Sequence, residues 1–306
     1  MILICGIAIL LGAPAARADK LHLSPEAKQA LEKMYGGDPD AAIPLAQEIE
    51  KDQPDHPLGY LLEAEARWWK IYCAACEIKW GMVDAWKRSK SPGDEAYLAL
   101  ADRGIKLAEA QLKNNDTAEM HLYAGVGWAL KARLFGLREE KRATARAGVN
   151  ARDQFLRATK LDPDLADAYT GLGLYNYYVD TLSPIIRLLR IFMGIPGGNK
   201  KEGMRQLERA MKEGELTAVE ARFYFAKNLR TYDQQYERAT SLVEPLTARF
   251  PNNPLFLMLL GNLNAELNRQ QKAAVSFQAA QKLTIPDPAC AARVRQIAEM
   301  SLASFH

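Results

Sequence analysis

The chain has 306 residues, of which 48% are hydrophobic and 25% charged, and its formal net charge is +3. This balance is typical of a folded globular protein. So small a net charge, with no basic stripe interleaved with aromatic residues, argues against nucleic-acid binding, and we expect no nucleic-acid partner.

The first residues have the pattern of an export signal. Residues 2–11 are almost all apolar, and Ala16-Arg17-Ala18 stands just before Asp19, which is the arrangement of an apolar core followed by a cleavage site. A transmembrane helix needs about 20 apolar residues, more than this run offers. We therefore expect residues 1–18 to be a signal peptide and the mature protein to be periplasmic or secreted. No Lys or Arg directly follows Met1, so a membrane anchor formed by an uncleaved N-terminus is the alternative.

The remaining residues, 19–306, predict one domain built from successive helices. Ser24-Pro25 and Asp38-Pro39 are helix starts, each with an N-cap side chain followed by proline in the first turn. Further helices are expected over about 57–69 with an extension toward residue 80, over 94–113, 117–135, 138–161 and 164–180, from residue 200 onward, and over 288–303 as a cap. Sustained alternation of apolar and polar residues is absent, so we expect no β-structure.

A pattern measured from prolines recurs along these helices with a period of about 34 residues. The residues that carry it are Leu257, Leu260, Gly261, Ala273, Phe277 and Ala280 after Pro251, and Ala151, Phe155, Ala158, Tyr169, Leu172 and Gly173 around Pro163. Small residues let two helices approach closely, and a large residue one turn away fills the remaining space. In the last repeat we expect Phe277 to fill the crossing beside Gly261 and Ala273.

This pattern resembles that of the tetratricopeptide repeat (TPR) family. The resemblance implies an all-α fold, a right-handed TPR-type α-solenoid of about five to six helical hairpins with a capping C-terminal helix. It also implies a non-enzymatic scaffold that binds a protein or peptide partner in its concave groove. In chaperone-binding members a Lys and Asn clamp holds a terminal carboxylate. Here only Asn262 matches that clamp, so a ligand of this kind is not expected.

An insert, defined as residues 182–199, interrupts the repeat period. Residues 175–200 resemble the bacterial relatives of the tetratricopeptide-repeat-39 and inclusion-body-clearance family, with an aromatic helix, a proline, an apolar helix containing arginines, and a glycine-rich turn. Insertions between repeats often lie on the binding face. The candidate partner-binding residues are therefore Tyr177, Tyr178, Asp180, Arg187 and Arg190.

The insert leaves alternatives open. Its helix, residues 184–193, carries six large apolar residues, Ile185, Ile186, Leu188, Leu189, Ile191 and Phe192. So much apolar surface has to cover a neighbour, a ligand or a partner. It can be plain packing on the solenoid, a lid over the groove, or an element that lies on a membrane surface.

Cysteines and aromatic residues cluster in the first third of the chain. Removal of the signal peptide leaves Cys73, Cys76 and Cys290, an odd number, so we expect a free or intermolecular thiol and no disulfide-stapled scaffold. The C-x-x-C pair Cys73 and Cys76 could serve thiol redox chemistry, but inside a helix we interpret it as packing. The nearby aromatics, Trp68, Trp69, Tyr72, Trp80 and Trp86, are expected in the core.

Motifs that carry catalysis are absent from the sequence. There is no nucleophile elbow, no phosphate-binding loop and no metal-ligand spacing among His22, His56, His121 and His306. We expect no enzymatic activity, no cofactor and no metal. The sequence thus predicts an exported scaffold for a protein or peptide. The alternative is a periplasmic protein that binds or handles a small ligand, with residues 182–199 as its lid.

Overall fold

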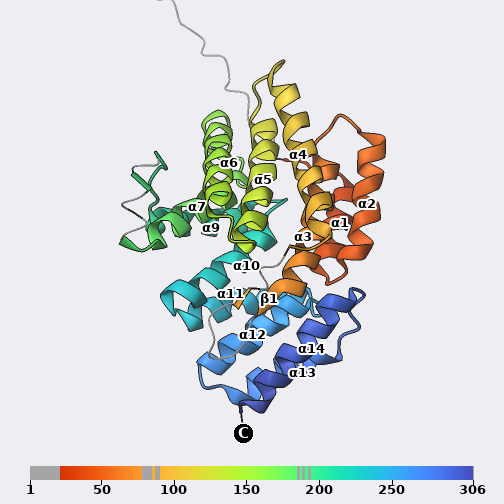
Figure 1. The fold of residues 1–306 in the computed structure, drawn as a ribbon, viewed down its shortest axis with the longest axis vertical. Helices are drawn as coiled ribbons and strands as arrows, with labels where there is room; N and C mark the ends of the chain where they lie inside the picture. The colour runs from red at the N-terminus through yellow and green to blue at the C-terminus, as the bar shows by residue number, and fades with distance from the viewer. Residues whose placement is uncertain are drawn as a thin grey trace, which may run out of the picture.

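The computed structural model describes residues 21–77, 85–86, 90–184, 187, 190–191 and 194–305 (Figure 1). The expected signal peptide, residues 1–18, lies outside this range. The described elements are α1 (Pro25–Tyr35), α2 (Pro39–Asp52), α3 (Leu58–Ala75), β1 (Cys76–Glu77), β2 (Ala85–Trp86), α4 (Gly93–Leu112), α5 (Ala118–Leu137), α6 (Lys141–Leu161), α7 (Ala168–Thr181), α9 (Lys200–Glu213), α10 (Ala218–Asn228), the π-helix η1 (Leu229–Asp233), α11 (Tyr236–Arg249), α12 (Pro254–Glu266), α13 (Gln270–Lys282) and α14 (Pro288–Ala303).

These helices form the predicted α-solenoid. In the described part of the chain the hairpins are α1/α2, α3/α4, α5/α6, α7/α9, α10/α11 and α12/α13, and α14 covers the last of them. Each helix packs on the next in sequence, and the first helices of neighbouring hairpins also contact one another: α1 with α3, α3 with α5, α5 with α7, and α7 with α10. The all-α repeat fold with its capping helix is therefore confirmed.

Local sequence signals explain where many helices begin. Ser24, Asp38 and Thr117 each accept a hydrogen bond from the backbone N–H three residues later, which satisfies a donor that the first turn leaves open. Asn253 and Asp287 cap α12 and α14 in the same way, and in both helices proline stands in the first turn. The bounds predicted for α14 agree with the structure.

One predicted boundary is wrong. Helix α3 ends at Ala75 and does not extend toward residue 80, and Cys76–Glu77 pairs antiparallel with Ala85–Trp86. The prediction that β-structure would be absent is therefore incorrect at this point. Two-residue strands are too short to show the alternation on which that prediction rested.

The predicted contact between Gly261 and Phe277 is present, since a Cβ added to Gly261 would lie 2.8 Å from the Phe277 ring. Phe155 fills an equivalent crossing, but against glycines that the pattern did not assign to it: a Cβ added to Gly171 would lie 1.9 Å from its ring, and one added to Gly125 2.6 Å. The assigned Gly173 lies against Leu207 instead. Both phenylalanines are buried, so each fills a helix crossing that only glycine leaves open.

The first helix of each hairpin is buried on more than one side. In α12 nearly every residue is buried, including Phe256, and in α10 the buried set includes Phe223, Tyr224 and Phe225. The second helices bury a single stripe instead, as Gly203, Leu207 and Ala210 do in α9. A helix that is apolar around its circumference is surrounded by protein, so the inner layer of the solenoid is covered on its inner side as well.

Helix α3 provides that inner cover. Figure 1 shows α3, in orange, meeting α12 and α14, in blue. The ring of Trp69 lies 5.2 Å from that of Phe223 and 5.8 Å from that of Phe256. Tyr72 of α3 adds a second contact to Phe223, at 6.0 Å. The predicted core role of these aromatics is confirmed for Trp68, Trp69 and Tyr72, whereas the side chains of Trp80 and Trp86 lie outside the described residues.

The first hairpin meets the other end of the solenoid directly. The Asn253 side-chain amide donates to the Tyr35 carbonyl oxygen at 2.9 Å, and the Tyr35 ring lies 6.1 Å from that of Phe250. Gly37, with a φ of +93°, lies so close to Asn252 that a Cβ there would be 2.2 Å from the Asn252 carbonyl oxygen. We call this junction of α1–α3 with α11–α14 the seam. The solenoid closes on itself at the seam.

The described helices offer no membrane crossing. Among those residues, none of the helices combines the length and the apolar character that a span requires.

Phe277→Ala should destabilise the protein by about 3–5 kcal/mol, because it removes a fully buried ring and leaves a cavity beside Gly261. The measurement is chemical denaturation followed by circular dichroism. Val275, on the same helix, is 67% exposed, so Val275→Ala is the matched control and should change little. Equal stability of the two variants would contradict the assigned repeat register.

A pair of carboxyl groups joins α2 to α3. Glu50 lies against Glu63, which in turn accepts a hydrogen bond from Arg67 Nε at 2.7 Å. Burial, followed by the negative charge of Glu63, raises the pKa of Glu50 to about 7 from an ordinary value of 4.5. The folded protein therefore holds a proton between about pH 4.5 and pH 7 that the unfolded chain releases. The stability contributed by protonated Glu50 is complete below about pH 4.5 and is lost as the pH rises through about 7.

Glu50→Gln keeps this side chain neutral at every pH. The variant should match the parent protein near pH 4.5 and exceed its melting temperature at pH 8. Melting temperatures measured from pH 4.5 to 8.5 test this, with Glu48→Gln, an exposed position on the same helix, as control. The raised pKa of Glu50 would be refuted if the melting temperature of the parent protein did not fall relative to that of Glu50→Gln between pH 4.5 and pH 8.

Candidate interaction site

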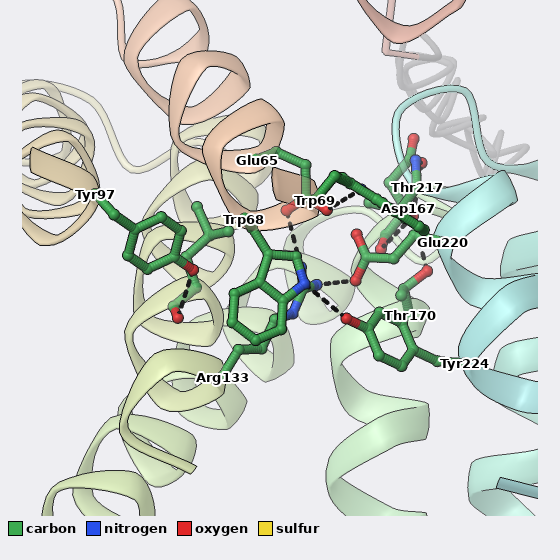
Figure 2. A network of polar contacts seen from close by, with 11 residues as sticks. Glu65, Trp68, Trp69, Tyr97, Arg133, Asp167, Thr170, Thr217, Glu220 and Tyr224 are labelled. Carbon is green, nitrogen blue, oxygen red and sulfur yellow. Dashed lines mark hydrogen bonds and ion pairs between the residues drawn. The ribbon is translucent and has the colours of Figure 1, made fainter. Parts of the chain in front are cut away.

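The solenoid interior, where a concave groove was predicted, contains a network of buried polar residues (Figure 2). Arg133 of α5 donates to Glu65 Oε2 at 2.8 Å and forms a second ion pair with Glu220. Its guanidinium also lies 5.3 Å from the Tyr224 ring. These residues come from α5, α3 and α10, so the arginine joins three helices that are far apart in sequence. Although burial works to lower the pKa of Arg133, the charge of Glu65 and the neighbouring tyrosines raise it above its ordinary value.

The two tryptophans of α3 complete the network. Trp68 Nε1 donates to the Tyr224 hydroxyl at 2.8 Å, and Trp69 Nε1 donates to Glu65 Oε1 at 3.0 Å. Each indole N–H therefore has a partner, as buried Trp requires. Figure 2 shows Trp68 lying between Tyr97 and Tyr224, with ring centroids 6.1 Å apart for Trp68 and Tyr97. Side chains of α3 thus occupy the place of a groove ligand.

Asp167 fixes the entry to α10 on the other side of the network. Its carboxylate accepts hydrogen bonds from the backbone N–H groups of Glu215, Leu216 and Thr217 at 2.8–3.1 Å, and the Thr217 hydroxyl adds a bond to the Thr170 hydroxyl at 2.7 Å. Burial raises the pKa of Asp167, although these donors work to lower it. The Asp167 carboxylate is committed to these donors and stabilises the approach of α10 to α7.

The structure places the five predicted partner-binding residues in different surroundings. Tyr177 is buried, its hydroxyl donates to Asp233, and Lys200 forms an ion pair with the same carboxylate while lying 5.3 Å from the Tyr177 ring. Asp180 accepts a hydrogen bond from the Lys200 backbone N–H at 3.0 Å and so caps α9. Both predicted residues therefore form contacts within the protein, Tyr177 with η1 and Asp180 with the start of α9.

Arg187 and Arg190 differ from each other as well. Arg187 is exposed, whereas Arg190 Nη1 donates to the Ile195 carbonyl oxygen at 3.0 Å and folds back onto the return of the insert. That return is anchored to α7, because the Tyr175 hydroxyl donates to the Pro196 carbonyl oxygen at 2.9 Å. Among the insert's apolar residues, Ile185, Ile186, Leu188, Leu189 and Phe192 lie outside the described residues, and Ile191 is 64% exposed.

Tyr178 and Tyr232 form a row of aromatic rings that leads from the buried Tyr177 to the surface. The Tyr178 ring lies 6.4 Å from that of Tyr177 and 6.0 Å from that of Tyr232. Tyr232 is 50% exposed although it belongs to η1. Tyr232 and Asp233 were not among the predicted site residues, because a π-helix has no sequence pattern that distinguishes it from the end of an α-helix. Such turns are frequent at functional sites. Lys200 begins α9, and no sequence pattern shows that its side chain reaches Asp233.

A disulfide closes the seam. Cys73 of α3 is bonded to Cys290 of α14, with 5.1 Å between the Cα atoms. The prediction that the protein carries no disulfide staple is wrong, as is the interpretation of Cys73 as a packing residue only. The two cysteines are 217 residues apart, and no sequence spacing points to such a pair. In the chain-entropy model, a closed loop of this length stabilises the folded state by about 5 kcal/mol. The side chain of Cys76 lies outside the described residues.

A small cavity lies beside this bond. It has a volume of about 20 Å³ and is lined at the seam by Trp69, Lys70, Cys73, Asp287 and Cys290, among others. Such a volume holds about one water molecule. It is far below the roughly 300 Å³ of a small-ligand pocket, and it lies at the seam, between α3 and the start of α14, not at the insert.

Arg133→Ala should destabilise the protein by about 3–5 kcal/mol, because two buried carboxylates would lose their shared cation. Urea denaturation measures the loss. Arg205→Ala, which removes an exposed ion pair to Glu202, is the control and should cost less than about 1 kcal/mol. Combining Arg133→Met with Glu65→Gln and Glu220→Gln should restore much of the stability. A single variant as stable as the control would contradict the role of Arg133.

Comparisons with known proteins agree with the repeat fold. The family described as Iml2/Tetratricopeptide repeat protein 39 matches residues 168–297. One similar solved structure is MamA, with 16% identity over 63% of this chain and 94% of that chain and a TM-score of 0.41. Another is the TPR protein YrrB "with an unusual peptide-binding site", with 16% identity over 82% of this chain and 97% of that chain and a TM-score of 0.35. A third is human IFIT1, with 12% identity over 92% of this chain and 70% of that chain and a TM-score of 0.40. At these TM-scores the overlays carry no argument. The helical hairpins, their packing and the family match indicate a tetratricopeptide-repeat-type fold, and over residues 168–297 the chain is similar to the Iml2/tetratricopeptide repeat protein 39 family.

Proposed function

We propose that this protein is an exported, non-enzymatic scaffold that binds a protein or peptide partner on the surface formed by the insert and η1. The observation that carries this proposal is the filled interior: Trp68, Trp69 and Tyr72 of α3 are buried where a groove ligand would lie. A partner of the closed protein therefore has to bind elsewhere.

The insert surface offers the chemistry that partner binding needs. It combines the exposed side chains of Ile191 and Tyr232 with the charge of Arg187. Aromatic residues and arginine are enriched among the residues that dominate interface energetics. Tyr175 and Asp180 hold the return of the insert and the start of α9 on α7, and Tyr177 bonds to Asp233 of η1. Because the insert is anchored in this way, binding through Ile191 should require little loss of conformational entropy.

Export is supported by the disulfide. Bonds such as Cys73–Cys290 persist in oxidising compartments and are rare in the cytosol of mesophilic organisms. The same argument holds for a periplasmic, a secreted or an N-terminally anchored protein, since each places the repeats outside the cytosol.

The experiment compares two surface variants with two matched controls. Arg187→Glu and Tyr232→Ala should each weaken recovery of a crosslinked partner at least tenfold in the exported fraction while leaving the melting temperature unchanged. Arg205→Glu, an exposed arginine on α9, and Val275→Ala, an exposed apolar residue on α13, should retain it. Photo-crosslinkers at positions 191 and 275 provide the readout.

Two results would contradict the proposal. If the crosslinker at position 275 captures the partner and that at position 191 does not, the binding surface lies elsewhere on the solenoid. If all four variants bind equally, the insert surface has no role in recognition.

A further inference from the structure

The Cys73–Cys290 disulfide is a covalent bond across the seam, and it joins two helices with different roles in the fold. Cys290 lies in the first turn of α14, the terminal helix, which packs on α13, α12 and α3. Cys73 lies near the end of α3, the helix that fills the interior. The bond therefore links the helix that covers the groove to the helix that ends the solenoid.

Noncovalent contacts at the seam include exposed or weak ones. Lys70 pairs with Asp287 at 3.6 Å, and the ion pair between Arg249 and Glu32 is largely exposed. Exposed pairs contribute little to stability. The ring contacts of Trp69 with Phe223 and Phe256 are stronger, and they join α3 to α10 and α12.

The ion network of Glu65 and Arg133 lies outside the seam, because it joins α3 to α5 and α10. Loss of the seam contacts would leave this network in place, and it would continue to hold α3 in the interior of the solenoid.

We propose that the Cys73–Cys290 disulfide is a redox latch. In the oxidised protein the ring is closed and the groove is occupied by α3. In the reduced protein α14 separates from α3, and the faces of these two helices that meet at the bond become accessible to solvent. This open state does not depend on where the closed protein binds its partner.

The chemistry of the latch is thiol–disulfide exchange. On closing, the Cys73 and Cys290 thiols give two electrons and two protons to the disulfide of a thiol oxidoreductase, which becomes a dithiol. Opening is the reverse reaction, with a dithiol as reductant. Both sulfur-bearing residues are buried, so a reductant reaches the bond only when α14 opens locally. Local opening of this kind takes less free energy than global unfolding.

Only the seam is expected to respond. Each repeat of a solenoid is stabilised chiefly by its neighbours, and α5 and α6 pack on each other and on α4 and α7, away from α14. Loss of the bond should therefore free residues 288–303 and their seam contacts while the central hairpins stay folded.

Hydrogen exchange followed by mass spectrometry tests the latch on the full mature protein. Three samples are compared: oxidised protein, the same protein reduced with a phosphine, and Cys290→Ser. Cys76→Ser is the matched control, since it removes a thiol and leaves the bond. In the reduced and Cys290→Ser samples, exchange should accelerate at least tenfold over residues 30–35, 69–73 and 288–303 and stay unchanged over 118–161.

Three outcomes would overturn the proposal. Unchanged exchange at the seam would mean that noncovalent contacts close the ring alone. Equal acceleration in every helix would mean that the disulfide is a global staple. A Cys73–Cys76 pair, with Cys290 free, in peptide maps of the oxidised protein would mean that the latch does not form.

Discussion

The interior position of α3 is the constraint on which the rest of the structure depends. An α-solenoid has an inner layer whose helices are covered by protein on their outer side only, unless another element fills the axis. Here α3 does so with Trp68, Trp69 and Tyr72. This explains why α10 and α12 are buried on both sides, why an arginine joins three helices in the middle of the molecule, and why the first and last hairpins meet.

The sequence predicted what is encoded locally. N-cap side chains, first-turn prolines and the contact of Gly261 with Phe277 all act over a few residues or one repeat, so pattern reasoning recovered the helices and the register of the last repeat. Ring closure and the Cys73–Cys290 bond depend on residues about 217 positions apart. No periodicity carries that information, and an odd cysteine count shows only that at least one thiol is left over.

The candidate site shows the same division at smaller scale. Composition and the broken repeat period drew attention to residues 175–200, and the structure shows how that segment is held. It could not be seen from the sequence that Tyr177 and Asp180 are committed to α9 and η1, or that Arg190 folds back onto Ile195. Tyr232 lies in a turn whose hydrogen-bond pattern, not its residue types, brings it to the surface.

Closure at the seam changes how the molecule resists unfolding. A linear array of repeats has two free ends, and its terminal hairpins fray because each lacks one neighbour. In this chain α1 has a neighbour in α11 and α12, and α14 has one in α3. The usual reason for terminal weakness is then missing, and a lesion in the last helix is felt by the first. Sequence distance from a terminus is therefore a poor guide to which parts of this protein tolerate change.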